Sequence, residues 1–183
     1  MKVKILFENH KIIEGENFGY PLTQPVLGEM VFNTAMTGYQ EILTDPSYAQ
    51  QIVVMTFPEI GIYGISPSFF ESMKPELNAF IVKDYFDHPS HHESNTTLDH
   101  FLKSFHVPGI KNIDTRDLTL FLRDNGNQKS IIVPEDFSNE KALDLLSQYE
   151  IPHSHVQQVS TKRPMRIPGT GFRVVLMDFG YKK

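Results

Sequence analysis

The sequence contains no cysteine among its 183 residues. A chain without cysteine has neither a disulfide framework nor a thiolate ligand for a metal ion. The same absence excludes a cysteine nucleophile, because no side chain here can supply the attacking sulfur. Thiolate chemistry of every kind is therefore excluded within these residues.

Long runs of a single chemical character are also missing. No apolar run approaches the ~20 residues of a membrane-spanning helix. The N-terminal residues 1–7 alternate lysine with apolar side chains and lack the apolar core of a signal peptide. No cluster of Lys or Arg offers a stripe for phosphates, and the formal net charge is -5. We therefore expect a cytoplasmic protein that binds neither membrane nor nucleic acid.

The composition is that of a soluble globular protein. Hydrophobic residues make up 40% of the chain and charged residues 21%, which are ordinary proportions for such a protein. A chain of this length buries roughly 70% of the surface that its unfolded form exposes. The length fits one domain, or one domain plus a fragment.

The first half of the sequence predicts mainly strands. Val3, Ile5 and Phe7 alternate with lysines and leucine, as on one face of a strand. A turn at residues 8–10 leads to a second strand at residues 11–14, and residues 15–25, with two Gly and two Pro, predict a connecting loop. Further strands are expected at residues 30–32, 52–55 and 79–82, and Phe69, Phe70 and Met73 permit one short helix.

The second half predicts helices alternating with strands. Leu98, Phe101, Leu102 and Phe105 follow the i, i+3, i+4, i+7 spacing of an amphipathic helix. Two more helices are expected after the capping residues Asp114 and Ser138, with strands near residues 110–113 and 130–133. This order favours an α/β architecture with mixed sheets over a doubly wound Rossmann fold.

The C-terminal part changes in character. Residues 152–171 are rich in Pro, Gly and basic side chains, which predicts a linker. Residues 174–179 are strongly apolar and predict a strand close to the last residue. Two interpretations stay open at this point: the strand pairs with the edge of the preceding sheet, or it begins a second domain.

The most informative stretch is residues 28–64, which read GEMVFNTAMTGYQEILTDPSYAQQIVVMTFPEIGIYG. Two apolar strands enclose a segment dense in polar side chains, and loops carry function more often than cores do. Asp45-Pro46-Ser47 is typical of a tight turn, because Asp can accept from the backbone ahead of it and Pro fixes φ. The stretch therefore predicts an exposed, functional turn.

This stretch resembles the N-terminal domain of the small subunit of carbamoyl-phosphate synthetase. The family has a similar block from GE-hydrophobic-FNT through MTGYQEILTDPSY to a GxYG turn. Further similarity lies in Asp114-Thr115-Arg116-Asp117-Leu118-Thr119 and in Asp178-Phe179-Gly180-Tyr181-Lys182. The resemblance implies an α/β fold of the mixed-sheet, three-layer β/β/α swivelling type over residues 1–151. It also implies a linker at 152–171 and, at 172–183, the first strand of a truncated class I glutamine amidotransferase domain.

The resemblance also implies a function. Small subunits of this type hydrolyse glutamine with a Cys-His-Glu set in their C-terminal domain, and the ammonia passes to a large subunit. The large subunit uses ATP, a divalent metal and bicarbonate to make carbamoyl phosphate for arginine or pyrimidine biosynthesis, so no cofactor is expected in this chain. Carried over by position, Ser47 contacts the bound glutamine; no catalytic residue and no metal ligand is expected here. The expected partners are the large subunit, the chain's own glutaminase domain and glutamine.

Two positions depart from the family pattern. The usual GNYG appears as Gly61-Ile62-Tyr63-Gly64, which replaces an amide by an apolar side chain. Where many relatives have Ser-Asn-x-Arg, this sequence has Ser90-His91-His92-Glu93 and lacks the cation. No subunit-contact role is therefore carried over to these positions.

An alternative is a self-contained enzyme or binding domain that uses Glu29, Glu41, Asp45 and Ser47. Paired carboxylates can perform acid–base chemistry, although Ser47 does not lie in a G-x-S-x-G elbow. This alternative requires a deep pocket in which the acidic groups converge. A small-molecule sensor is a third possibility.

Other motifs are better explained as structure. Arg116 can bind an anion or form an ion pair, and the ion pair is favoured. His91-His92 and His153-x-His155 lack a third metal ligand at a recognisable spacing. Gly169-Thr170-Gly171 precedes a strand instead of following one, and Asp178-Phe179-Gly180 lacks the other kinase motifs.

Overall fold

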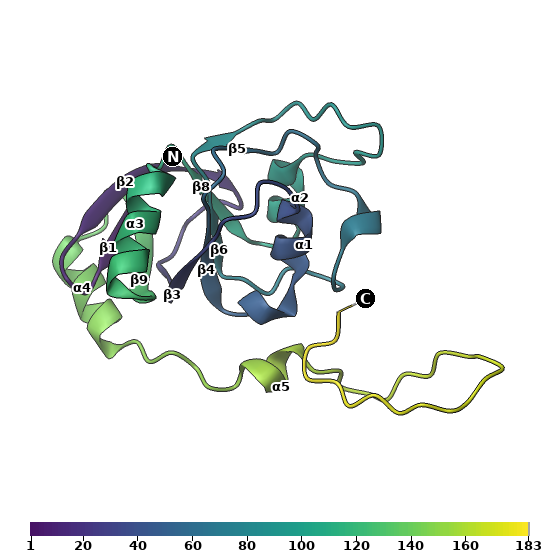
Figure 1. The fold of residues 1–183 in the computed structure, drawn as a ribbon. Helices are drawn as coiled ribbons and strands as arrows, with labels where there is room; N and C mark the ends of the chain where they lie inside the picture. Colours follow the sequence, from purple (N-terminus) through teal and green to yellow (C-terminus); the bar gives the residue numbers. More distant parts are fainter. Residues whose placement is uncertain (183) are drawn as a thin grey trace.

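Seven strands close into a barrel in a computed structural model that describes residues 1–182 (Figure 1). Their order around the barrel is β1-β2-β8-β6-β4-β3-β9. The strands are β1 (Lys2–Phe7), β2 (Ile12–Gly19), β3 (Val26–Asn33), β4 (Gln51–Met55), β6 (Ala79–Ile81), β8 (Pro108–Lys111) and β9 (Gln128–Pro134). A second, two-stranded sheet pairs β5 (Glu59–Ile60) with β7 (Asp84–Tyr85).

The barrel has a parallel part and an antiparallel part. β3, β4, β6 and β8 form a continuous parallel ladder, whereas β1 and β9 pair antiparallel with their neighbours, as β2 does with β8. The predicted α/β architecture with a mixed sheet is thus confirmed. The finer three-layer, swivelling-type description stays a prediction.

Three of the five helices in residues 1–182 begin at a side-chain cap. The helices are α1 (Tyr39–Thr44), α2 (Leu98–Ser104), α3 (Thr115–Asn125), α4 (Asn139–Gln148) and α5 (His155–Val159), with two 3-10 turns, η1 (Pro46–Tyr48) and η2 (Pro67–Phe69). Thr97, Asp114 and Ser138 each accept a hydrogen bond from the backbone amide three residues ahead. Such caps satisfy amides that have no partner inside the helix, and the three predicted helix starts are confirmed.

The inside of the barrel is filled by one face of every strand. Val3, Ile5 and Phe7 of β1 lie there with Met30 of β3, as the alternation predicts. Helix α3 adds Leu118, Leu122 and the partly buried Phe121 to the same cluster, so this helix closes over the barrel interior. The barrel is therefore a packed core rather than a channel.

The outer faces of the barrel are covered by α1, α2 and α4. Helices α1 and α2 cover the side of β4 and β6 that carries Val53 and Phe80. Helix α4 covers Leu6, Ile131 and Val133. β4 is the strand predicted at residues 52–55, and its continuous apolar run is explained by burial on both faces.

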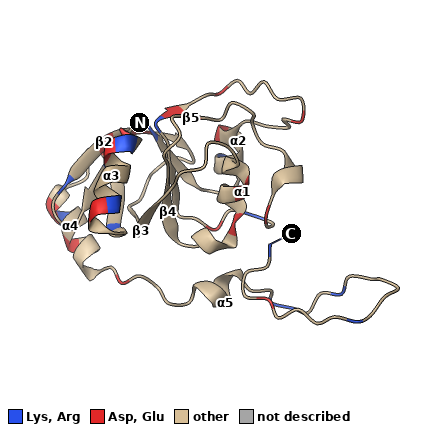
Figure 2. Cartoon of the chain, viewed as in Figure 1, with Lys and Arg blue, Asp and Glu red and all other residues tan. Residues whose placement is uncertain are grey.

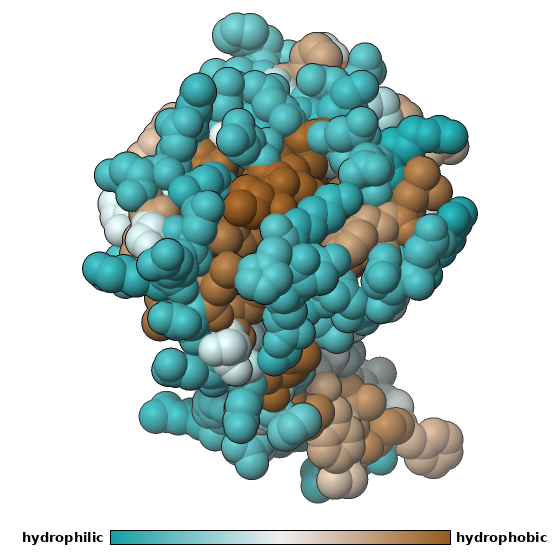
Figure 3. Space-filling model, turned by 90° about the vertical axis from the view of Figure 1, so that its left-hand side faces the viewer, coloured by the Kyte–Doolittle hydropathy of each residue, from teal (hydrophilic) through white to brown (hydrophobic). Residues whose placement is uncertain are grey.

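The surface mixes charge signs and contains one visible apolar band. Basic and acidic residues occur together on α2, α3 and α4 (Figure 2). Seen from the side of α3 and α4, an apolar band runs between polar side chains (Figure 3), and Leu120 and Leu145 of these helices remain 40% and 41% exposed. Among residues 1–182, none of the helices has the length and apolar character needed to cross a bilayer.

Strand β2 corrects the loop predicted at residues 15–25. The strand continues to Gly19, so Gly15 lies inside it. A Cβ at Gly15 would lie 2.6 Å from Ile113 Cδ1 and 3.0 Å from the Lys111 backbone oxygen. Glycine is present because two segments approach closely, and it does not end the strand.

The prediction of a short helix at Phe69, Phe70 and Met73 is also wrong. Only the 3-10 turn η2 forms there, with the Ser66 side chain accepting from the Ser68 amide. Phe69 and Met73 are 39% and 77% exposed. Without burial of an apolar face, this short segment lacks the packing that stabilises a helix.

The strand predicted at residues 174–179 is absent. The side chain of Val174 is 84% exposed and that of Phe179 is 65% exposed, and the segment pairs with no strand within residues 1–182. Each barrel strand already has two neighbours, so no edge is free to accept another. Pairing with the preceding sheet is thus wrong, and the predicted linker contains helix α5. The predicted 172–183 domain segment stays a prediction, and Lys183 lies outside the described residues.

The close contact at Gly109 gives a test of the barrel packing. A Cβ there would lie 2.5 Å from the ring of Phe18, which stacks on Tyr85 and cannot easily move. We expect Gly109→Ala to lower the free energy of unfolding by about 1–3 kcal/mol, as overpacking does. Urea unfolding measures this, with Gly169→Ala as control because no atom lies within 4 Å of its added Cβ. Equal stability of Gly109→Ala and the unaltered chain would contradict the packing.

Candidate functional site

The segment between β3 and β4, residues 34–50, holds Glu41, Asp45 and Ser47, three of the four residues predicted to be functional; Glu29 lies in β3. The segment connects two neighbouring parallel strands, and α1 lies on the outer face of the barrel. Tyr39, Ile42 and Leu43 are buried there. The apolar side of this short helix fixes the segment to the barrel, while its polar side chains bind the loop at residues 61–72.

Tyr63 holds the start of α1. Its hydroxyl oxygen accepts hydrogen bonds from the backbone amides of Gly38 (2.7 Å) and Tyr39 (3.0 Å). The residue at the cap position is Gly38, which has no side chain to do this and adopts φ 84°. Burial raises the pKa of Tyr63 despite these amide hydrogen bonds, so the hydroxyl stays neutral.

The Tyr39 ring strengthens the same contact. It stacks on the Tyr63 ring with centroids 4.2 Å apart, and its hydroxyl donates to the Gly64 backbone oxygen at 2.6 Å. Burial raises the pKa of Tyr39 above its ordinary value. Both hydroxyls therefore act as neutral hydrogen-bonding groups.

Gln40 and Thr44 tie the remainder of α1 to the loop. Both are almost fully buried, and the side chain of each makes a hydrogen bond. The Gln40 side-chain oxygen accepts from the Ser66 amide at 2.6 Å. The Thr44 hydroxyl donates to the Gln40 backbone oxygen and accepts from the Glu71 amide, both at 2.9 Å. These polar residues of the block are structural.

Ser47 lies at the surface, on the turn that the sequence predicts. The carboxylate of Asp45 accepts from the Ser47 amide at 2.8 Å, which fixes the 3-10 turn η1. Next to it, Asn33 donates to the Tyr48 hydroxyl at 2.9 Å. The Ser47 residue is exposed, so its hydroxyl is presented to solvent from a rigid backbone.

The C-terminal segment lies against the same turn. Lys182 Nζ is 2.6 Å from Asp45 Oδ2, and a Cβ on Gly180 would lie 3.5 Å from Pro46 Cβ. Asp178 shapes this segment by accepting from the amides of Gly180 (2.8 Å) and Tyr181 (2.7 Å). Gly180 and Lys182 therefore lie beside η1, and Figure 1 shows the C-terminal trace folding back toward the rest of the chain.

The charge on Asp45 is stabilised in this arrangement. Partial burial by itself would raise the pKa of the Asp45 carboxyl. The hydrogen bonds from Lys182 Nζ and from Ser47 outweigh it, so the pKa lies below its ordinary value. Asp45 is consequently a carboxylate at neutral pH and does not serve as a proton donor.

The other acidic residues of the alternative site do not join Asp45. Glu29 accepts from Gln51 Nε2 at 2.7 Å and from Asn127 Nδ2 at 3.4 Å. Glu41 lies beside Gly38, in the first turn of α1. Each carboxylate has different neighbours, so the structure does not bring the acidic groups together for acid–base catalysis.

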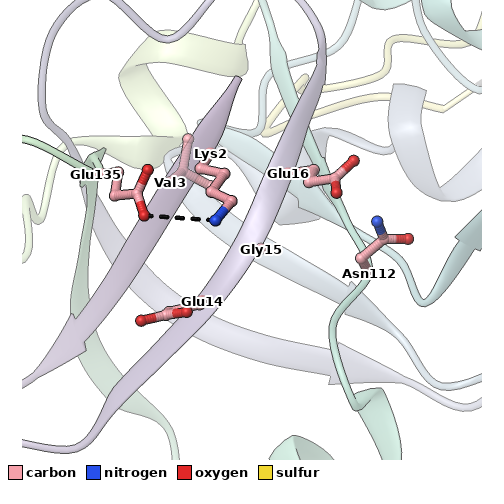
Figure 4. Close-up of a pocket in the computed structure, with 7 residues that line it drawn as sticks. All are labelled: Lys2, Val3, Glu14, Gly15, Glu16, Asn112 and Glu135. Carbon is pink, nitrogen blue, oxygen red and sulfur yellow. Dashed lines mark ion pairs between the residues drawn. The ribbon is translucent and has the colours of Figure 1, made fainter.

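Two cavities lie elsewhere on the barrel. The smaller, about 180 Å³, is lined by β1, β2 and the ends of β8 and β9, where Lys2 is 3.8 Å from Glu135 (Figure 4). The larger, about 830 Å³, includes Arg116. Neither cavity is lined by any of the four residues of the alternative site. Within residues 1–182, Arg116 makes no ion pair. The prediction that Arg116 forms an ion pair is therefore wrong.

Sequence reasoning placed Ser47 at an exposed turn but missed Tyr63 and Gln40. The available signal was Gly38, because a helix that starts after glycine has no side-chain cap of its own and must obtain one from another segment. That segment is 25 residues further along the chain, as the separation of Gly38 and Tyr63 shows.

Comparison with known proteins decides the family. The profile described as "Carbamoyl-phosphate synthase small chain, CPSase domain" matches residues 5–132. The chain belongs to this family.

Individual relatives agree with that assignment. The chain is 46% identical to the "Carbamoyl phosphate synthase pyrimidine-specific small chain" of Bacillus subtilis, over 100% of this chain and 50% of that protein. It is 42% identical to the carbamoyl phosphate synthase small chain of Oceanobacillus iheyensis, over 99% of this chain and 49% of that protein. The Clostridium perfringens small chain is 43% identical, with coverage of 100% and 52%. The chain therefore spans about half the length of these relatives.

The lowered pKa of Asp45 predicts how stability depends on pH. The folded-state pKa of Asp45 lies below the ordinary value of 3.8. The charged carboxylate therefore stabilises the fold at pH values above 3.8. The contribution is lost as the pH falls through the folded-state pKa. We expect Asp45→Asn to lower the free energy of unfolding by less than about 1 kcal/mol near pH 7, since the Lys182 partner is partly exposed.

Urea unfolding of the unaltered chain and of Asp45→Asn, over a descending pH series, measures this difference in the free energy of unfolding. The two free energies should converge below about pH 4. Asp144→Asn, at an exposed position on α4, is the control and should show no such convergence. A difference for Asp45→Asn that stays constant with pH would contradict a role for the charge.

Proposed function

We propose that this chain is the N-terminal part of a glutamine-dependent carbamoyl-phosphate synthase small chain and that Ser47 borders the glutamine site. The synthase would obtain ammonia from glutamine and use it, with ATP and bicarbonate, to form carbamoyl phosphate. The observation that carries the proposal is the exposed Ser47 hydroxyl on a turn fixed by Asp45. The geometry suits binding better than catalysis, because the Asp45 carboxylate beside Ser47 already pairs with Lys182 and accepts from the Ser47 amide, and its lowered pKa makes it a weak base.

A serine hydroxyl suits the recognition of an amino acid. It can donate to a carboxylate or accept from an ammonium group, and glutamine has both. The hydrogen bond to Asp45 and the anchored helix α1 hold the turn before a ligand arrives. Such preorganisation reduces the ordering cost of binding.

The position of the C-terminal segment supports the proposed domain order. In that order, residues 152–171 link to an amidotransferase domain whose first strand begins at residue 172. Residues 178–182 lie beside η1 through the Lys182–Asp45 contact, so the glutaminase domain would be next to Ser47. The unpaired apolar residues 174–179 would gain neighbouring strands within that domain.

The proposed division of labour follows from the missing thiol. Hydrolysis of an amide through a thioester needs a thiolate, and this sequence contains no cysteine. The nucleophile would belong to the glutaminase domain, and ATP and a divalent metal to the large partner subunit on which this domain docks. A swivelling-type fold and a cytoplasmic location belong to the same proposal.

Substitution of Ser47 in a small chain of full length, assembled with its large subunit, tests the role. We expect Ser47→Ala to raise KM for glutamine about tenfold, the effect of losing one hydrogen bond to a charged group. Ammonia-dependent synthesis should be nearly unchanged, because that route bypasses the glutamine site. Steady-state assays with each nitrogen source separate the two effects.

The chain offers a matched control at η2. Ser66-Pro67-Ser68-Phe69 repeats the cap–Pro–Ser–aromatic arrangement of Asp45-Pro46-Ser47-Tyr48, and Ser68 is likewise exposed. Ser68→Ala should leave both activities intact. Equal loss of glutamine-dependent and ammonia-dependent synthesis in Ser47→Ala would show that Ser47 acts in assembly or stability instead, and unchanged activities would show that it has no role.

A further inference from the structure

The larger cavity has the dimensions of a small-molecule site. Its volume is about 830 Å³, within the roughly 300–1,000 Å³ typical of ligand pockets. It lies between the ends of the parallel strands and the first half of α3. Its lining includes Thr34, Thr56, Lys83, Asp84, Asn112 and Arg116.

The cavity forms where the parallel strands end. Thr34 and Thr56 directly follow β3 and β4, Asn112 directly follows β8, and Lys83 is the second residue after β6. Each of these strands runs parallel to the next, so their carboxyl ends lie at the same end of the barrel. This end is where parallel α/β folds bind ligands, because the chains diverge there and leave a crevice.

The cavity is separate from the turn that carries Ser47. Turn η1 precedes the first residue of β4, whereas Thr56 follows its last residue. Five residues of strand separate the two ends, a length of roughly 17 Å. Ligand binding in the cavity therefore does not depend on the proposed role of Ser47.

Two cations line the cavity without a neutralising partner. Lys83 and Arg116 are exposed, and in the part of the chain that the structure describes neither lies within ion-pair distance of a carboxylate. Of the two carboxylates present, that of Asp114 caps α3 by accepting from the Asp117 amide at 3.0 Å. Asp84 is the remaining negative group. Arg116 also lies in the first turn of an 11-residue helix, where the helix dipole favours an anion.

The wall between the two cations is held in a fixed conformation. Asn112 adopts φ 62°, a left-handed conformation that few residues other than glycine adopt. Its amide donates to the Lys83 backbone oxygen at 2.7 Å, which ties the end of β8 to the end of β6. The backbone positions of Lys83 and Arg116 are thus fixed relative to one another, since Arg116 follows Asn112 by four residues.

We propose that this cavity is a binding site for a small anion, held through a phosphate or carboxylate group by Lys83 and Arg116. Arg presents a planar fork of donors and Lys a compact charge, a pair suited to either group. The threonine hydroxyls and Asn112 supply neutral hydrogen bonds around it. Asp84 opposes the anion and limits its affinity.

Isothermal titration of the 183-residue chain with inorganic phosphate, and separately with succinate, tests the proposal. We expect saturable binding of at least one, and the preferred probe distinguishes a phosphate ligand from a carboxylate ligand. Lys83→Gln and Arg116→Gln should each weaken binding about tenfold, the effect of losing a charged hydrogen bond. Asp84→Asn should tighten it.

Arg123→Gln is the matched control. Arg123 is an arginine on the same helix, in its last turn, and it is paired with Asp124 at 2.8 Å. The Arg123→Gln substitution should leave the affinity for the anion unchanged. Thermal unfolding checks that every variant is folded. The proposal is overturned if neither anion binds saturably, or if Arg123→Gln weakens binding as much as Arg116→Gln does.

Discussion

The hydroxyl of Tyr63 is the contact on which the presentation of Ser47 depends. Helix α1 has six residues and starts after a glycine, and a helix this short is not stable alone in water. The Tyr63 hydroxyl accepts hydrogen bonds from the Gly38 and Tyr39 amides at the start of α1. Gln40 and Thr44 hold the rest of the helix to the same loop. Only Asp45 separates turn η1 from α1, so the position of the turn follows from these hydrogen bonds.

The two ends of the parallel strands consequently differ in character. At the end before β4, buried side-chain hydrogen bonds and the Asp45 cap present an exposed hydroxyl from a rigid turn. At the opposite ends of the strands, the chains diverge around a cavity lined by Lys83 and Arg116, two cations that form no ion pair among the described residues 1–182. Closure of the barrel connects the two ends through a packed interior to which α3 contributes.

Local patterns predicted the elements whose causes are local. Asp114 caps α3 as expected, because a cap and its amide are three residues apart. Gly15 was misjudged, since the reason for it is Ile113, close in space and distant in sequence. Residues 174–179 have strand-like composition, but a strand needs a neighbour and the closed barrel offers none. At the site, the turn chemistry predicted an exposed Ser47. The cap from Tyr63 comes from another loop, and Gly38 at the cap position signals only that an outside partner is needed, not which residue supplies it.

The most direct test of this account is amide hydrogen exchange across residues 38–48 in Tyr63→Phe. The variant keeps the ring that stacks on Tyr39 and removes only the accepting oxygen. The account predicts exchange about tenfold faster at these amides, the size of a lost helix cap, and no change in Tyr20→Phe, at an exposed tyrosine. Exchange in Tyr63→Phe at the rate of the unaltered chain would contradict it.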